Sequence, residues 1–241
     1  DLDGLILSIA IEKNFDKISS YFFFFFRCFV SDTEVLYDVA IANVLRPFGY
    51  ELTREDKLSV MGRTGPEGAD ILIRKHSLPI TVDQYLTIID EEYKIVFAGD
   101  IEILPGAERL IRHLHQNQIP IAVATSSTKL AFDLKISHHK DLFKLFDHFV
   151  IAPEEPEIKR GKPDPKTFLI AAERFKTPPT DMSKVLVLED SVAGIQAANN
   201  AGMLSVWVPD SRTPKNLASP TLILNSLQEI RPEFFGLPSF D

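Results

Sequence analysis

The chain has 241 residues, 45% of them hydrophobic and 25% charged, which is enough for one or two globular domains with a complete core. Its net charge of −8 argues against a nucleic-acid-binding surface, because the phosphate backbone attracts basic faces. The single cysteine, Cys28, excludes an internal disulfide and favours a reducing compartment. No stretch approaches the roughly 20 apolar residues of a membrane span, so we expect a cytoplasmic protein that binds neither nucleic acid nor membrane.

The first four residues are Asp1-Leu2-Asp3-Gly4, and because neither an initiator methionine nor a cationic leader precedes them, we expect the chain to be truncated here. In an extended segment side chains alternate in direction, so Asp1 and Asp3 would point to the same side. One carboxylate could then act as a nucleophile while the other transfers protons. Acidic tetrads that end in glycine are also common in turns, so this interpretation depends on groups that later segments supply.

Residues 5–33 show neither helical nor strand periodicity, and Tyr21 is followed by five consecutive phenylalanines. A soluble surface would not readily expose such a run. A buried structural strand is the simplest interpretation, and a short amphipathic or membrane-touching segment is the alternative.

Residues 34–97 are expected to form four helices and no strand. The first helix ends before Pro47, and Thr53 is the expected N-cap of the second. The third has Pro66 in its first turn, and the fourth, within 86–96, repeats apolar residues at three- and four-residue spacing. This pattern predicts a small all-α unit that is inserted into the rest of the chain.

After Gly106 the pattern changes to alternating strands and helices. Continuous apolar runs of strand length predict strands that are buried on both faces. This order is typical of a doubly wound α/β domain, in which ligands bind beyond the carboxyl ends of the parallel strands. The expected strands are 119–124, 149–152, 185–188, 204–208 and 221–224, and the expected helices are 107–117, 129–137, 165–175 and 192–201.

Two segments could bind phosphate. Thr125-Ser126-Ser127 follow an expected strand, where hydroxyls and N–H groups at the start of a helix can hold a phosphate; ordinary capping of the next helix is the alternative. Gly161-Lys162-Pro163-Asp164-Pro165 holds a lysine between rigid residues, and a fixed ammonium could neutralise a phosphoryl oxygen. In the simpler interpretation, Asp164 and Pro165 are only the N-cap and first residue of a helix.

A third segment could bind a metal ion. Glu189 and Asp190 end the most apolar expected strand, where adjacent carboxylates are costly unless they meet a cation or a hydrogen-bond donor. Carboxylate oxygens of this kind suit Mg²⁺, which commonly bridges to a substrate phosphate. Helix capping by Asp190 is the alternative.

An acidic pair, a strand-end hydroxyl, a lysine and a second acidic strand end, in this order, resemble the four motifs of the haloacid dehalogenase superfamily. The resemblance covers nearly all of residues 32–241 and is strongest to phosphatases of pseudouridine 5′-phosphate. It implies a Rossmann-like α/β core formed by 1–7 and 98–241 and a helical cap formed by 32–97. The implied activity is that of a monomeric, Mg²⁺-dependent phosphatase of a small phosphorylated metabolite, with glycerol phosphate, a sugar phosphate or flavin mononucleotide as alternative substrates.

The same resemblance implies how the phosphoryl group is transferred. Asp1 would be the nucleophile that forms an aspartyl-phosphate, and Asp3 would protonate the leaving oxygen and then activate a water molecule. Thr125, the Ser126 backbone and Lys162 would hold the transferring phosphoryl group.

The resemblance also implies a metal site and a cap contact. Asp190, the Asp1 carboxylate and the Asp3 carbonyl would bind Mg²⁺, with Glu189 either a further ligand or a partner of the ligands. Arg63, in a loop between two helices of the cap, would face the substrate; a solvated surface arginine is the alternative.

Two features depart from the family pattern. An apolar strand that normally precedes the first aspartate, and would lie in the middle of the sheet, is absent. Residues 8–31, 24 in number, intervene where the family passes almost directly from a segment like 1–7 to one like 32–34. We hypothesise a retained intron or a misplaced exon boundary, because pyrimidine-rich DNA before a splice acceptor encodes runs of phenylalanine.

Transcript sequencing tests that hypothesis: reads that join the codons of Leu7 and Asp32 would support it, and abundant reads through the phenylalanine run would exclude it.

Two other classes of protein stay open from the sequence. A receiver-like signalling module also combines carboxylates, a hydroxyl and a lysine on a parallel sheet, and a catalytically dead remnant could retain all these residues. Magnesium-dependent turnover of an aryl phosphate separates both from a phosphatase.

Overall fold

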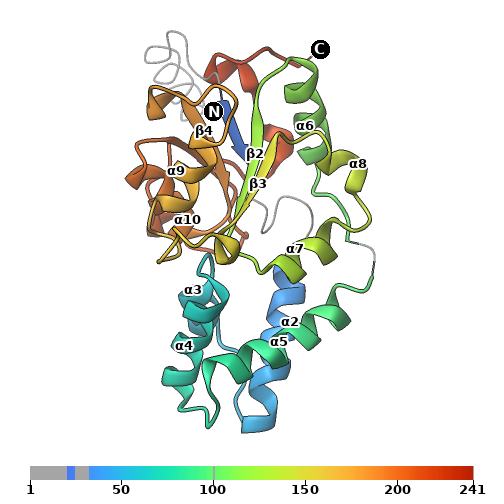
Figure 1. Cartoon of the computed structure of the whole chain (residues 1–241), viewed down its shortest axis with the longest axis vertical. Coiled ribbons are helices and arrows are strands. Elements are labelled where there is room, and N and C mark those ends of the chain that lie inside the picture. Colours follow the sequence, from blue (N-terminus) through green and yellow to red (C-terminus); the bar gives the residue numbers. More distant parts are fainter. Residues whose placement is uncertain (1–20, 25–32, 100, 241) are drawn as a thin grey trace.

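The computed structural model describes residues 21–24, 33–99 and 101–240. In this part of the chain a six-stranded parallel sheet has the order β3-β2-β1-β4-β5-β6 (Figure 1). Each of the five strands expected after residue 118 is present within two residues of its expected limits. The strands are β1 (Tyr21–Phe24), β2 (Ile121–Thr125), β3 (His148–Ile151), β4 (Val185–Glu189), β5 (Leu204–Trp207) and β6 (Leu222–Ile223).

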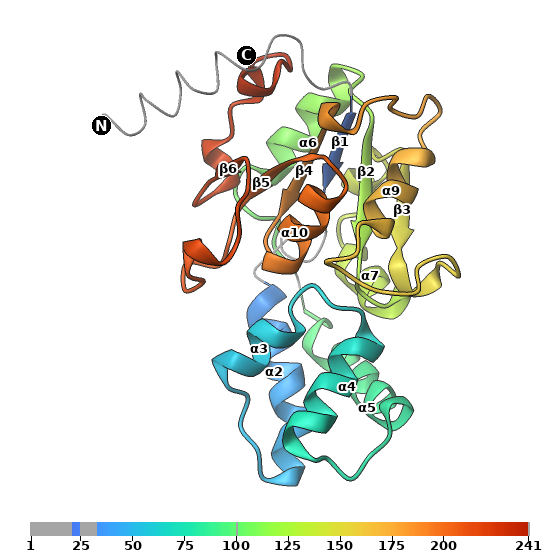
Figure 2. The same ribbon diagram turned by 90° about the vertical axis from the view of Figure 1, so that its left-hand side faces the viewer.

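Helices cover both faces of this sheet, as a doubly wound α/β fold requires. Helices α6 (Ala107–Gln116) and α7 (Lys129–Ile136) lie on one face, and α9 (Lys166–Glu173) and α10 (Val192–Asn200) lie on the other (Figures 1 and 2). The short helix α8 (Lys140–Phe143) follows α7 and contacts α6. The central strands β2 and β4 are buried along their whole length, which agrees with the apolar residues that precede Thr125 and Glu189 at their carboxyl ends.

Strand β1 is the main difference from the expected core. We expected the middle of the sheet to lack a strand, but Tyr21–Phe24 pairs with β2 on one side and with β4 on the other. The strand interpretation of the phenylalanine run is therefore confirmed for these four residues, which belong to the core sheet and not to a separate insert. The rest of the expected insert 8–31, together with the expected core segment 1–7, lies outside the described residues.

The four expected helices of the all-α unit are α2 (Thr33–Leu45), α3 (Arg54–Val60), α4 (Gly65–His76) and α5 (Val82–Val96). Threonines at the N-caps of α3, α4 and α5 each form a capping box with the residue three positions on, which satisfies N–H groups at the start of each helix. Apolar side chains from all four helices form a core separate from that of the sheet. No described helix is both long and apolar enough to cross a lipid bilayer.

The all-α unit lies beyond the carboxyl ends of the sheet strands (Figure 1). Hydrogen bonds join it to the loops that follow β2 and β3, so the unit covers the edge at which parallel sheets bind ligands.

Candidate active site

The loop after β2 presents hydroxyl groups at the edge of the sheet. Thr128 is the N-cap of α7, so the alternative in which Thr125 or Ser126 caps that helix is excluded. The Thr125 hydroxyl accepts a hydrogen bond of 3.1 Å from the Ser127 N–H and holds the loop in a tight turn. Ser126 is buried, and its hydroxyl has no hydrogen-bond partner among the described residues. A buried hydroxyl in this position is suited to a bound ligand.

Lys162 lies in the same region, paired with a carboxylate from β4. Its ammonium donates to Glu189 Oε1 at 2.6 Å, and both side chains are at most 3% exposed. The ammonium also lies over the ring of Phe168 on α9. The expected helix start at Asp164 is displaced: Pro165 is the N-cap, and the Asp164 carboxylate accepts from the Lys166 N–H. Lys162 is therefore held by packing and charge before the helix begins.

Glu189 is fully engaged in hydrogen bonds. Its Oε2 accepts from the N–H groups of Asp190 and Ser191 and from the Ser191 hydroxyl, and its Oε1 accepts from Lys162. Burial raises the pKa of this carboxyl, but the Lys162 ammonium and the hydrogen bonds offset that effect and hold the pKa below its ordinary value. These contacts favour the role of a partner that orients neighbouring groups over that of a direct metal ligand.

Asp190 is buried at the carboxyl end of β4. Ser191 is the N-cap of α10, because its hydroxyl accepts from the Gly194 N–H, so the alternative in which Asp190 caps the helix is excluded. The Asp190 carbonyl accepts a hydrogen bond of 2.8 Å from the indole N–H of Trp207, which fixes the backbone at this strand end. The oxygen donors of Asp190 are of the type that Mg²⁺ prefers.

The sheet register relates the two strand ends. Phe24 of β1 is opposite Val123 of β2 and opposite Leu188 of β4, so Thr125 and Glu189 lie at nearly the same level on either side of β1. Neighbouring strands are about 4.8 Å apart, so these two ends are about 10 Å apart, with the end of β1 between them. The structure thus brings the Thr125, Lys162 and Asp190 segments to one edge of the sheet.

The expected acids Asp1 and Asp3 lie outside the described residues, and their predicted position beside this edge stays a prediction. Within the described ranges, no three His, Cys, Asp or Glu side chains gather into a metal site. In the sequence, Phe24 is followed by Phe25 and Phe26, and the next carboxylate is that of Asp32.

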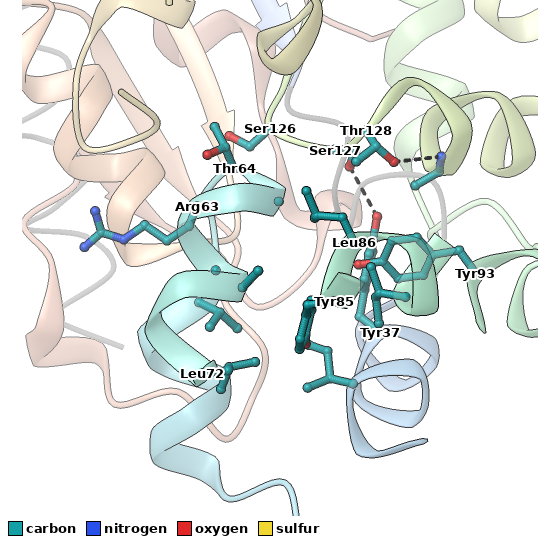
Figure 3. Close-up of a pocket in the computed structure, with 17 residues that line it drawn as sticks. Tyr37, Arg63, Thr64, Leu72, Tyr85, Leu86, Tyr93, Ser126, Ser127 and Thr128 are labelled. Carbon is teal, nitrogen blue, oxygen red and sulfur yellow. Dashed lines mark hydrogen bonds between the residues drawn. The ribbon is translucent and has the colours of Figure 1, made fainter. Parts of the chain in front are cut away.

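A cavity lies between the all-α unit and the loop after β2 (Figure 3). Its wall in the all-α unit is apolar and aromatic, with side chains of Tyr37, Leu72, Tyr85, Leu86 and Tyr93. At its other end are hydroxyl groups, those of Thr64, Ser126, Ser127 and Thr128. The cavity is therefore polar at one end and apolar and aromatic at the other.

Arg63 comes from the loop between α3 and α4 and borders this cavity, but its guanidinium points away from the other cavity residues (Figure 3). Its Nη1 donates to the Lys162 carbonyl at 3.2 Å. Arg63 therefore contacts the core at the candidate site, which does not fit the alternative of a purely solvated arginine. Its contact with a substrate stays a prediction.

Lys135 and Tyr37 also lie at this edge and were not predicted as site residues. Lys135 on α7 is buried, and its ammonium donates to the hydroxyls of Tyr37 and Ser127 at 3.0 and 2.9 Å. These bonds link the all-α unit to the loop after β2. The sequence signal was available: Lys135 lies three and four positions after Phe132 and Ala131, which places it on the buried face of its helix.

Comparisons with known proteins agree with this geometry. The protein of Drosophila melanogaster named probable pseudouridine-5′-phosphatase is 42% identical over 210 residues, which cover 87% of this chain and 90% of that protein. The mitochondrial (DL)-glycerol-3-phosphatase 1 of Arabidopsis thaliana is 39% identical over 212 residues, which cover 87% of this chain and 70% of that protein.

The fold also matches solved structures. The crystal structure of β-phosphoglucomutase from Clostridium difficile superposes with a TM-score of 0.76 over 91% of this chain and 96% of that one. Because the two sequences are only 22% identical, this similarity supports the fold alone. Residues 1–202 match the family of haloacid dehalogenase-like hydrolases, which confirms the resemblance found in the sequence. The chain belongs to this haloacid dehalogenase-like family and is a phosphoric monoester hydrolase.

Proposed function

We propose that this hydrolase cleaves a small phosphomonoester at the edge of the sheet that the all-α unit covers. The observation that carries the proposal is that buried hydroxyls at the end of β2 and the buried ammonium of Lys162 lie at the same edge. Hydroxyls, backbone N–H groups and a fixed cation together can neutralise and orient a transferring phosphoryl group. Thr125, Ser126 and Lys162 are the residues proposed to bind it.

In the proposed reaction, the Asp1 carboxylate attacks phosphorus and the bond from phosphorus to the leaving oxygen breaks. Asp3 gives its proton to that leaving oxygen, and then takes a proton from the water that cleaves the aspartyl-phosphate and releases inorganic phosphate. Asp1→Asn should abolish turnover, and no phosphoenzyme should be trapped when the reaction is quenched. Asp3→Asn should still permit slow phosphorylation of Asp1. A chain in which Asp1→Asn retains wild-type kcat would refute the role of Asp1.

Mg²⁺ is the proposed cofactor, and the residues at the end of β4 suit it, because the buried Asp190 offers oxygen donors and Glu189 is occupied by Lys162. Asp190 would hold the ion together with Asp1 and Asp3. Bound Mg²⁺ would offset the repulsion between an anionic nucleophile and an anionic phosphate. Activity should be lost on chelation and return with Mg²⁺, and Asp190→Asn should require more Mg²⁺ for half-maximal activity.

The proposed substrate is pseudouridine 5′-phosphate. A planar base would lie against the half-buried side chain of Tyr93, with the phosphate towards the hydroxyls at the other end of the cavity. The similarity to a protein named as a probable pseudouridine-5′-phosphatase supports this choice. Glycerol 3-phosphate is the second candidate, supported by the similarity to a glycerol-3-phosphatase, although glycerol would leave the aromatic wall uncovered.

A panel of phosphomonoesters tests the choice. The value of kcat/KM should be highest for pseudouridine 5′-phosphate and lower for glycerol 3-phosphate, a hexose phosphate and flavin mononucleotide. Tyr93→Ala should lower kcat/KM for the nucleotide more than for glycerol 3-phosphate, because only the nucleotide would cover this side chain. Equal losses for both substrates would contradict the proposed role of the aromatic wall.

A further inference from the structure

Helix α4 of the all-α unit makes a direct contact with the segment that carries Lys162. The Glu67 carboxylate accepts hydrogen bonds from the Gly161 N–H, at 3.0 Å to Oε1 and 3.2 Å to Oε2. Gly161 immediately precedes Lys162, so this bond fixes the backbone one residue from the ammonium that pairs with Glu189. A backbone N–H that donates to a carboxylate is a charge-assisted and comparatively strong hydrogen bond.

Glu67 is itself held in place before it reaches the core. It is the third helical residue of α4 and completes the capping box, in which its Oε2 accepts from the Thr64 N–H at 3.1 Å and from the Thr64 hydroxyl at 2.8 Å. The capping box therefore fixes the side-chain rotamer, and little conformational entropy remains to be lost when the carboxylate meets Gly161.

Gly161 suits this close approach because it has no side chain. A Cβ atom at that position would lie 2.3 Å from Glu67 Oε2 and 2.9 Å from the Thr64 methyl group. Any other residue would push the loop and α4 apart.

Two neighbouring contacts join the same parts of the molecule. The Arg63 guanidinium donates to the Lys162 carbonyl at 3.2 Å. Gly62 has a φ of +80°, and a Cβ there would lie 2.7 Å from the Ser191 hydroxyl, which in turn donates to Glu189. The start of α4 and the loop before it thus lie against the backbone at Gly161 and Lys162 and against Ser191, which is hydrogen-bonded to Glu189.

We propose that Glu67 is a positioning residue: its bond to Gly161 orients the Lys162 segment when the all-α unit lies against the core. This inference rests on the proposed function for its effect on catalysis, but the contact itself can be tested separately. The bond from Glu67 to the core goes to the backbone N–H of Gly161, so Glu67 would act on Lys162 through that backbone. Removal of the Glu67 carboxylate should retain Lys162 but leave its ammonium less well oriented towards a phosphoryl group.

The test compares two capping-box variants. Gln84 occupies the same third helical position in α5 and accepts from the Thr81 N–H at 2.8 Å, and in the described part of the chain its hydrogen bonds join it only to Thr81. Glu67→Ala and Gln84→Ala should weaken their helices similarly, whereas only Glu67→Ala removes a bond to the core. Amide hydrogen exchange by NMR should then show Gly161 exchanging at least tenfold faster in Glu67→Ala and unchanged in Gln84→Ala.

Steady-state kinetics measure the effect on positioning. We expect Glu67→Ala to lower kcat/KM at least tenfold. Glu67→Gln should recover most of that loss, because an amide oxygen can still accept from the Gly161 N–H. The kcat/KM of Gln84→Ala should stay within twofold of wild type. Similar kcat/KM values in the two alanine variants would overturn the positioning role, and unchanged exchange at Gly161 would overturn the contact. A wild-type chain without turnover would overturn the proposed function but not the contact, which the exchange rates decide alone.

Discussion

The Lys162–Glu189 pair allows a quantitative test of the site's electrostatics. Lys162→Met removes one charge of a pair whose two side chains are 3% and 1% exposed, and leaves a carboxylate buried. Removing one partner of a buried ion pair typically costs about 3–5 kcal/mol of the free energy of unfolding. Because Oε2 of Glu189 keeps its donors from Asp190 and Ser191, we expect a loss of about 3 kcal/mol, at the lower end of that range.

Urea unfolding measures this loss directly. Trp207, the only tryptophan in the chain, is fully buried and donates to the Asp190 carbonyl, so its fluorescence reports on the site itself. The matched control is Lys144→Met, which breaks the exposed ion pair with Asp141 and should leave the free energy of unfolding nearly unchanged. Adding Glu189→Gln to Lys162→Met should restore about 1–2 kcal/mol, because the buried charge is removed.

The reasoning about burial would be refuted if Lys162→Met and Lys144→Met destabilised the protein equally. It would also be refuted if Glu189→Gln made the Lys162→Met protein less stable, since the remaining carboxylate would then not be the source of the loss.

Three further predictions concern the central strand, the all-α unit and the loop between α3 and α4. Phe23→Pro should cost at least about 3 kcal/mol in urea unfolding, because β1 is hydrogen-bonded to a strand on each side and proline has no N–H to donate. Burial raises the pKa of the Asp56 carboxyl, but hydrogen bonds, first of all from Thr53, hold this pKa below the ordinary 3.8. The ionised Asp56 carboxylate therefore stabilises the fold fully above about pH 4, and this contribution is lost as the pH falls. Asp56→Asn should make the free energy of unfolding depend less on pH in that range. Gly62→Ala should lower kcat/KM, because it places a Cβ atom 2.7 Å from the Ser191 hydroxyl at a φ of +80°.

Local sequence patterns were sufficient for most of the fold. Apolar runs of strand length predicted β2 to β6, since strands that are buried on both faces need apolar residues at successive positions. Thr53 and Pro66 predicted helix starts because their side chains act on the nearest backbone groups. The helix start lies one residue later than expected, at Pro165, although the Asp164 carboxylate still accepts from an N–H of the first turn, that of Lys166.

Contacts between distant segments were harder to predict. The sequence indicated that Lys162 and Glu189 belong to one site, but not that they form a buried pair with each other. The capping box of α4 involves only neighbouring residues, and nothing in that local pattern shows that Glu67 also reaches Gly161, 94 positions away. Such contacts depend on how the all-α unit lies against the core, which is set by packing between surfaces and not by local propensity.

The central strand shows most clearly where sequence reasoning ends. The middle of a parallel sheet has N–H and C=O groups on both sides to satisfy, so the position between β2 and β4 must be filled by some extended apolar segment. Tyr21–Phe24 meets that requirement, although no family pattern identifies it. The carboxyl end of β1 is the position between Thr125 and Glu189 at which a nucleophilic carboxylate would face both phosphate-binding groups and metal ligands. In this sequence phenylalanines follow Phe24, and the position of Asp1 and Asp3 at that edge stays a prediction.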